Sequence, residues 1–158
     1  MTELPPVWVC PRCGARLVSR NMWHSCGSFT LEDLFAGSAA EVLDLARGYV
    51  AMLSSLGDVQ VIAQKTRLVC VARVRFAGLY PRRDGFLASF ALHRWLDDRR
   101  IVKRDDYGPR WRAHFVLIRS EADLHEDLRS WLQESHDTVG PAARPVTTAA
   151  GRRPPAIP

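Results

Sequence analysis

The chain has 158 residues, of which 47% are hydrophobic and 25% are charged, and its formal net charge at pH 7 is +5. A chain of this size and composition is expected to form one globular core of ordinary size with a small appendage. No apolar run approaches the roughly 20 residues that a membrane-spanning helix needs, so a membrane partner is excluded.

Four potential metal ligands lie within the first 26 residues. They follow the pattern Cys-x2-Cys-x10-His-x-Cys and are Cys10, Cys13, His24 and Cys26. Three thiolates and one imidazole match the ligand set of a structural, tetrahedral zinc site. Gly14 follows the second cysteine, where a positive φ lets backbone amides point at the thiolates, and glycine adopts such a φ readily. The single-residue gap between His24 and Cys26 suits an extended segment, in which alternate side chains point the same way. We therefore expect residues 1–29 to form a zinc knuckle with Zn²⁺ as the cofactor.

Other uses of these cysteines are less favoured by the pattern. A redox Cys-x2-Cys pair usually starts a helix in a βαβ unit, which the residues around Cys10 do not indicate. A disulfide needs an oxidising compartment, yet residues 1–6 lack the basic and apolar regions of a signal peptide, so a cytoplasmic location is expected. Unliganded thiols are the remaining alternative. Catalytic zinc is disfavoured because four protein ligands leave no open position for water. Cys70, inside an apolar run, is expected to be a buried free thiol.

Two helices are predicted after the knuckle. Thr30 is a good N-cap for a short helix over residues 31–35, with Asp33 at the capping-box position. Residues 39–56 carry apolar side chains at three- and four-residue spacing, which predicts an amphipathic helix with Ser38 as its N-cap.

The hydrophobic period then changes to that of β-strands. Five segments rich in β-branched and aromatic residues are predicted as strands: 59–63, 67–76, 85–94, 100–107 and 111–119. Short turn signals separate them, among them residues 81–85. Connections this short favour antiparallel neighbours.

A last helix and a tail complete the predicted fold. Ser120 is expected to cap this helix, with Asp123 three residues further on. The tail, residues 137–158, has no aromatic side chains and is expected to be disordered. The predicted fold class is α+β: over residues 30–136, a five-stranded, mainly antiparallel sheet has helices packed on one face, and the small zinc knuckle precedes it.

Three segments of the chain resemble a known family. They read HSCGSFTLEDLFAG, KTRLVCVARVRFAGLYPRRDGFLASFALHR and GPRWRAHFVL. Together they resemble bacterial proteins that carry the domain of unknown function 5655, some of which have such a knuckle in front. The resemblance covers most of residues 8–136 and implies a small α+β unit, linked in some proteins to DNA restriction and modification. It implies no established activity and transfers no catalytic residue.

Charge is segregated along the chain. Residues 65–83 contain six basic residues and no acid, whereas residues 121–134 contain five acids and one arginine. Arginines close to aromatic side chains suit contacts with phosphates and bases. The candidate ligand-binding residues, from this run and from neighbouring strands, are Arg73, Arg75, His93, Arg112 and His114. The alternative is that they are solvated or ordinary positions of the sheet.

We expect a non-enzymatic, zinc-containing binding module whose basic sheet face contacts nucleic acid or another anionic ligand. A protein-interaction or small-anion-binding regulatory domain is the alternative. A hydrolase is less favoured, because the chain contains neither a Gly-rich phosphate loop nor a Gly-x-Ser-x-Gly elbow, and no catalytic residue is predicted.

Overall fold

Six strands form the main sheet, and every neighbouring pair is antiparallel. The computed structural model describes residues 6–17, 19, 20, 22, 24, 26–108 and 111–141, and its strand order is β3-β4-β5-β6-β8-β7. These strands are β3 (Gln60–Ala63), β4 (Leu68–Val71), β5 (Arg75–Arg82), β6 (Gly85–Leu92), β7 (Ile101–Asp106) and β8 (Arg112–Ile118). A separate two-stranded sheet pairs β1 (Trp8–Val9) with β2 (Arg16–Leu17). The predicted α+β class is confirmed, but the sheet has six strands rather than five.

The additional strand comes from the segment predicted as one strand, residues 67–76. A bend at residues 72–74 ends β4 and precedes β5, and the pairing of these two strands shifts its register near the bend. β5 then continues beyond the predicted end, so that Pro81, predicted as part of a turn, is a strand residue opposite Phe86. Alternating side chains cannot distinguish one long strand from two short ones when the bend between them contains the same residue types.

Both helices predicted after the knuckle are present. α1 (Leu31–Leu34) begins with the predicted capping box, in which the Thr30 hydroxyl accepts from the Asp33 N–H and the Asp33 carboxylate accepts from the Thr30 N–H. α2 (Ala40–Ser54) is the predicted amphipathic helix. Its N-cap is Ala39, the residue after the predicted one, and makes no side-chain capping bond.

The last helix begins later than predicted. The capping box of Ser120 and Asp123 is present, but it closes a single 3₁₀ turn, η1 (Glu121–Asp123). α3 (Glu126–Glu134) follows this turn, and the ring of its N-cap His125 accepts a backbone N–H. A capping box is therefore a sign of a helical turn, and it does not determine whether the turn continues as an α-helix.

A π-helical turn, η2 (Ser135–Val139), continues α3 toward the C-terminus. The Ser135 hydroxyl lies within hydrogen-bond distance of backbone carbonyls on β5 and β6, which attaches the turn to the sheet. The tail expected from residue 137 begins inside this turn, and residues 142–158 lie outside the described residues.

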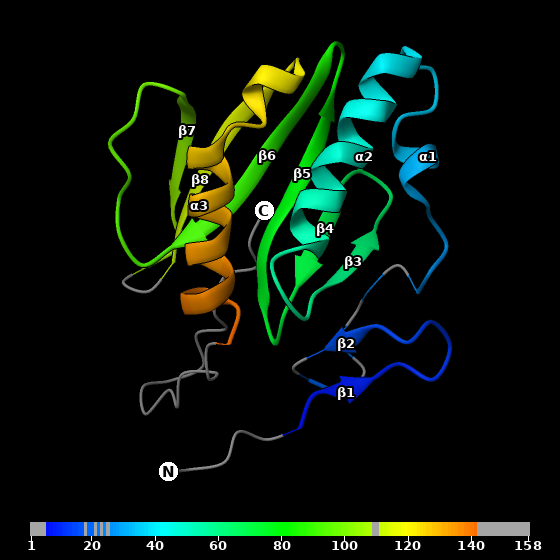
Figure 1. Cartoon of the computed structure of the whole chain (residues 1–158). Helices are drawn as coiled ribbons and strands as arrows, with labels where there is room; N and C mark the ends of the chain where they lie inside the picture. The colour runs from blue at the N-terminus through cyan, green and yellow to red at the C-terminus, as the bar shows by residue number, and fades with distance from the viewer. Residues whose placement is uncertain are drawn as a thin grey trace.

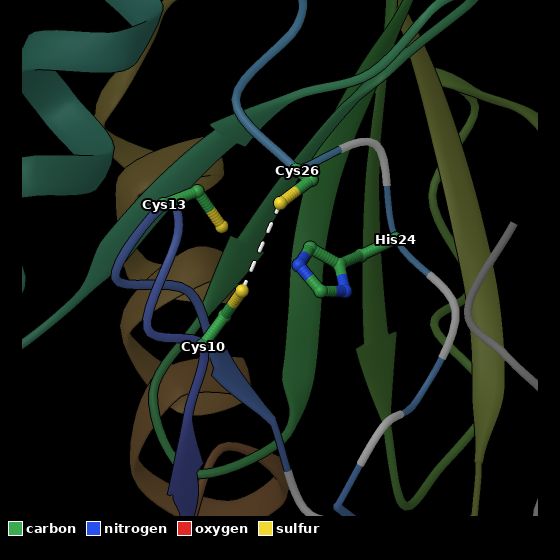
Figure 2. A group of neighbouring side chains, drawn as sticks. All are labelled: Cys10, Cys13, His24 and Cys26. Atoms are coloured by element: carbon green, nitrogen blue, oxygen red, sulfur yellow. Dashed lines mark hydrogen bonds between the residues drawn. The ribbon is translucent and has the colours of Figure 1, made fainter.

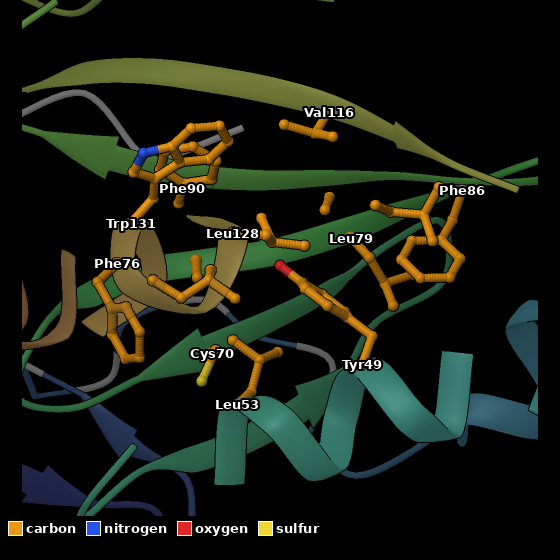
Figure 3. Close-up of a cluster of buried hydrophobic side chains, with 14 of the residues drawn as sticks. Tyr49, Leu53, Cys70, Phe76, Leu79, Phe86, Phe90, Val116, Leu128 and Trp131 are labelled. Atoms are coloured by element: carbon orange, nitrogen blue, oxygen red, sulfur yellow. The ribbon is translucent and has the colours of Figure 1, made fainter. Parts of the chain in front are cut away.

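The hydrophobic core lies between the sheet and helices α2 and α3, which cover the same face (Figures 1 and 3). Tyr49 of α2 is fully buried against Phe86, and its hydroxyl donates to the Gly78 carbonyl at 3.0 Å. Trp131 of α3 stacks on Phe90 of β6. In the part of the chain that the structure describes, no helix is long and apolar enough to span a membrane.

The opposite face of the sheet carries a different set of side chains. The strand register aligns one row across all six strands, namely Ile62, Val69, Gly78, Ser89, Phe115 and Lys103. Tyr80 and Arg67, which are joined by a hydrogen bond, and Arg75, whose strand partner is Val71, project from the same side. We call these nine residues the open face, because α2 and α3 both lie on the other side of the sheet (Figure 1), although Val69, Ser89 and Phe115 in the middle of this face are buried.

Candidate metal centre

The turn between β1 and β2 carries the first two cysteines. The Gly14 N–H donates to the Cys10 carbonyl at 2.8 Å, and the Cys10 N–H donates to the Ala15 carbonyl at 2.9 Å. Gly14 has a φ of +75°, as its position directly after Cys13 predicted. These bonds close a tight turn that keeps both cysteine side chains on the same side.

The four predicted ligands converge on one point (Figure 2). The Sγ atoms of Cys10, Cys13 and Cys26 and a ring nitrogen of His24 all lie within 4.8 Å of one another. The Sγ atoms of Cys10 and Cys26 are 3.7 Å apart. Two thiolates on a tetrahedral Zn²⁺, with Zn–S bonds of about 2.3 Å, lie about 3.8 Å apart. A disulfide needs about 2.05 Å, so the geometry fits a metal ion and disagrees with the disulfide alternative.

The tautomer of His24 is determined by a backbone carbonyl. Its Nδ1 lies 2.8 Å from the Met22 carbonyl oxygen and therefore donates to it. The other nitrogen, Nε2, is buried and has no hydrogen-bond partner among the described residues. A neutral histidine that donates from Nδ1 presents the lone pair of Nε2, which is the form that binds a metal. The sequence offered no sign of this partner, because a carbonyl group is present on every residue.

We predicted an extended segment for the second pair of ligands, but Cys26 itself is not extended. Cys26 has a φ of +51° and Gly27 a φ of +70°, so the chain makes a left-handed turn at the fourth ligand. A Cβ atom at Gly27 would lie 3.3 Å from Cys13 Cβ, a close approach that favours glycine. This left-handed turn lies at and directly after the fourth ligand, whereas Ser25, between His24 and Cys26, lies outside the described residues.

The thiols oppose one another's ionisation when no cation is present. Burial acts against the Cys10 thiolate, but hydrogen bonds from the backbone at Cys13 and Arg12 outweigh it and lower the pKa of Cys10 to about 6. Burial, with Cys10 and Cys13 close by, raises the pKa of Cys26 to about 11. A divalent cation would balance the charge of several thiolates at once, so the donor set fits a bound metal ion.

The five candidate ligand-binding residues do not lie together in one place. His93 and Arg112 meet at the end of the sheet where β6 ends and β8 begins, since an Arg112 Nη1–H donates to the His93 carbonyl at 3.4 Å. Arg73 lies in the bend between β4 and β5, where its N–H donates to the Gly140 carbonyl. Arg75 lies apart from these three, on the open face.

His114 is the fifth of these residues, and it is buried in the core. Its ring stacks on Phe90 at a centroid distance of 5.4 Å, and its Nε2 accepts the Leu96 N–H at 3.0 Å. The alternative interpretation of His114 as an ordinary sheet residue fits this position, because the side chain faces the helices.

Comparisons of the chain with protein-family models, with curated proteins and with solved structures found no match. The resemblance to the domain of unknown function 5655 therefore stays a prediction.

Proposed function

We propose that this chain is a zinc-stabilised binding module in which Cys10, Cys13, His24 and Cys26 hold a structural Zn²⁺. The observation that supports this function is the convergence of four ligand atoms within 4.8 Å, with the Nε2 lone pair of His24 directed to the cluster. Three thiolates with one imidazole are typical of zinc, and four protein ligands close the coordination sphere. The metal then stabilises the fold and takes no part in a reaction.

Metal analysis of the protein purified under reducing conditions tests this site. We expect one zinc ion per chain, and we expect Cys26→Ala to abolish stoichiometric binding because it removes one of four ligands. Cys70→Ala is the matched control, since Cys70 lies in the core away from the cluster, and it should retain the metal. A wild-type protein without stoichiometric metal, or a Cys26→Ala protein with the wild-type content, would contradict the proposal.

For the partner, we propose nucleic acid bound at the open face. Burial, followed by the nearby charge of Arg67, lowers the pKa of Arg75. Among the described residues Arg75 has no carboxylate within ion-pair distance. Two guanidinium groups on one face favour an anion such as phosphate, and the carboxylate of Asp105 on that face is paired with Lys103. Tyr80 lies beside them and supplies an aromatic ring of the kind on which bases stack.

Mobility-shift titrations with single- and double-stranded DNA and RNA test this partner. We expect binding at low salt that weakens as salt increases, and Arg75→Ala should reduce the slope of log Kd against log salt by about one. Arg47→Ala, on α2 at the opposite side of the sheet, is the control and should bind as the wild type does. Absence of binding at low salt would contradict the proposal. Binding of inorganic phosphate alone would support a small-anion site instead.

A further inference from the structure

The side chain of Gln60 attaches the knuckle to the main sheet. Gln60, the first residue of β3, accepts the Arg16 N–H at 2.6 Å and donates from its amide to the Gly14 carbonyl at 2.8 Å. The side-chain amide thus pairs with the knuckle as the backbone of a neighbouring strand would, across a separation of 44 positions in the chain from Arg16.

The two groups that Gln60 binds belong to the turn that carries the metal ligands. Gly14 follows Cys13 directly, and its N–H already donates to the Cys10 carbonyl. Ala15, between the two residues that Gln60 contacts, accepts the Cys10 N–H. The residues after Cys13 therefore form hydrogen bonds with Cys10 inside the knuckle and with Gln60 of the main sheet.

A second contact between the knuckle and the main domain is weaker. Arg16 forms an ion pair with Asp58 at 2.9 Å, but the Asp58 side chain is 87% exposed. Exposed ion pairs typically contribute between 0 and about 1 kcal/mol, because water and salt screen them. The two hydrogen bonds of Gln60 are directional, and both end on the backbone of the residues that follow Cys13. They therefore constrain the positions of the cysteines more directly than the ion pair does.

We propose that Gln60 is a positioning residue for the metal site and that it couples metal binding to the order of β3 and β4. The inference rests on the proposed function, since it requires that the cluster binds zinc. Hydrogen bonds to the residues that ligate a metal usually change metal affinity by about 10- to 100-fold when they are removed, and we expect a comparable effect for the bonds of Gln60 to the turn that carries the ligands. Coupling is reciprocal, so zinc must in turn stabilise the strand that carries Gln60.

Competition with a chromophoric chelator, applied to the full chain, measures the first half of this coupling. We expect Gln60→Ala to raise the Kd for Zn²⁺ by about 10- to 100-fold. Asp58→Ala is the control and should change the Kd by less than about fivefold. Gln60→Glu is a second variant of nearly equal volume: it keeps the acceptor for the Arg16 N–H but places a carboxylate against the Gly14 carbonyl, so it should also weaken binding.

Amide hydrogen exchange with and without zinc measures the second half. In the wild type, zinc should slow exchange in β3 and β4, and in Gln60→Ala this difference should be lost. A wild-type Kd in both Gln60 variants, with zinc-dependent protection retained, would overturn the inference. A loss of stability that is equal with and without zinc would also overturn it, because it would show a purely structural role. Failure of the wild type to bind zinc would instead contradict the proposed function.

Discussion

At the scale of single residues, the four cysteines are of two kinds. Cys10, Cys13 and Cys26 lie in the ligand cluster, whereas Cys70 is 0% exposed in the core, where burial raises the pKa of its thiol to about 12. A thiol reacts through its thiolate, so Cys70 is unreactive in the folded protein. This agrees with its prediction as a buried free thiol.

Counting thiols with an alkylating reagent tests this division. We expect no reactive thiol in the zinc-loaded protein, three after removal of zinc with a chelator, and all four after denaturation. Mass spectrometry of the alkylated protein gives the number directly. Alkylation of Cys70 in the folded, chelated protein would show that the core is more open than its burial indicates.

His114 makes stability depend on pH. Burial in the core lowers its pKa to about 4, from an ordinary value near 6.5. Between these values the unfolded chain takes up a proton that the folded chain does not, so stability falls as the pH decreases from 6.5 to 4. For this residue the loss between pH 7 and pH 5 should be about 2 kcal/mol.

Urea unfolding of wild type and His114→Gln at pH 7 and pH 5 isolates this effect. Both proteins keep the Cys–His cluster, so the acid sensitivity of the metal site cancels in the difference between them. Between pH 7 and pH 5, the decrease in the free energy of unfolding should be about 2 kcal/mol larger in the wild type than in the variant. Equal pH dependence of the two proteins would show that His114 titrates normally.

At the scale of elements, Gly78 in β5 and Gly48 in α2 differ in whether a larger side chain would fit. A Cβ atom at Gly78 would collide with the Leu68 carbonyl, because β4 and β5 approach closely there. At Gly48, in the middle of α2, the nearest atom to an added Cβ is Leu124 Cδ1 at 3.5 Å, an ordinary contact. Glycine is thus required in the strand and only tolerated in the helix.

Replacing each glycine by alanine should therefore have effects of opposite sign. Gly78→Ala should destabilise the protein by about 1–3 kcal/mol through overpacking. Gly48→Ala should stabilise it by about 0.5–1 kcal/mol, because alanine loses less conformational freedom in a helix. Thermal or urea unfolding measures both effects. An unchanged free energy of unfolding in Gly78→Ala would contradict the prediction, because it would show that β4 and β5 can move apart without loss of stability.

At the scale of the whole molecule, the knuckle and the main domain have separate interiors. Among the described residues, the main core contains buried residues from Phe35 to Val139 and none from the knuckle. In the part of the knuckle that the structure describes, the buried apolar residues are Cys10, Ala15 and Leu17. The main domain thus has a core of its own, and the knuckle contacts it through Gln60 and Asp58.

A chain that begins at residue 30 should consequently fold without zinc. Its far-ultraviolet circular dichroism should show the α+β spectrum, and its unfolding should stay cooperative, because the core lies entirely within the part that remains. Its stability should be insensitive to chelators, unlike that of the full chain. Loss of cooperative unfolding would show that the knuckle is needed for the main core.

The four candidate ligands could be predicted from the sequence, because a metal site of this kind requires particular residue types at close spacing. The α+β class and the capping boxes could also be predicted, because they depend on neighbours a few positions apart. The other features depend on the three-dimensional fold. The division of residues 67–76 into two strands, the burial of His114, the Met22 carbonyl that orients His24 and the attachment of the knuckle by Gln60 all depend on contacts between distant segments. Local patterns carry no information about such contacts, since any residue supplies a carbonyl and many strands contain a glutamine.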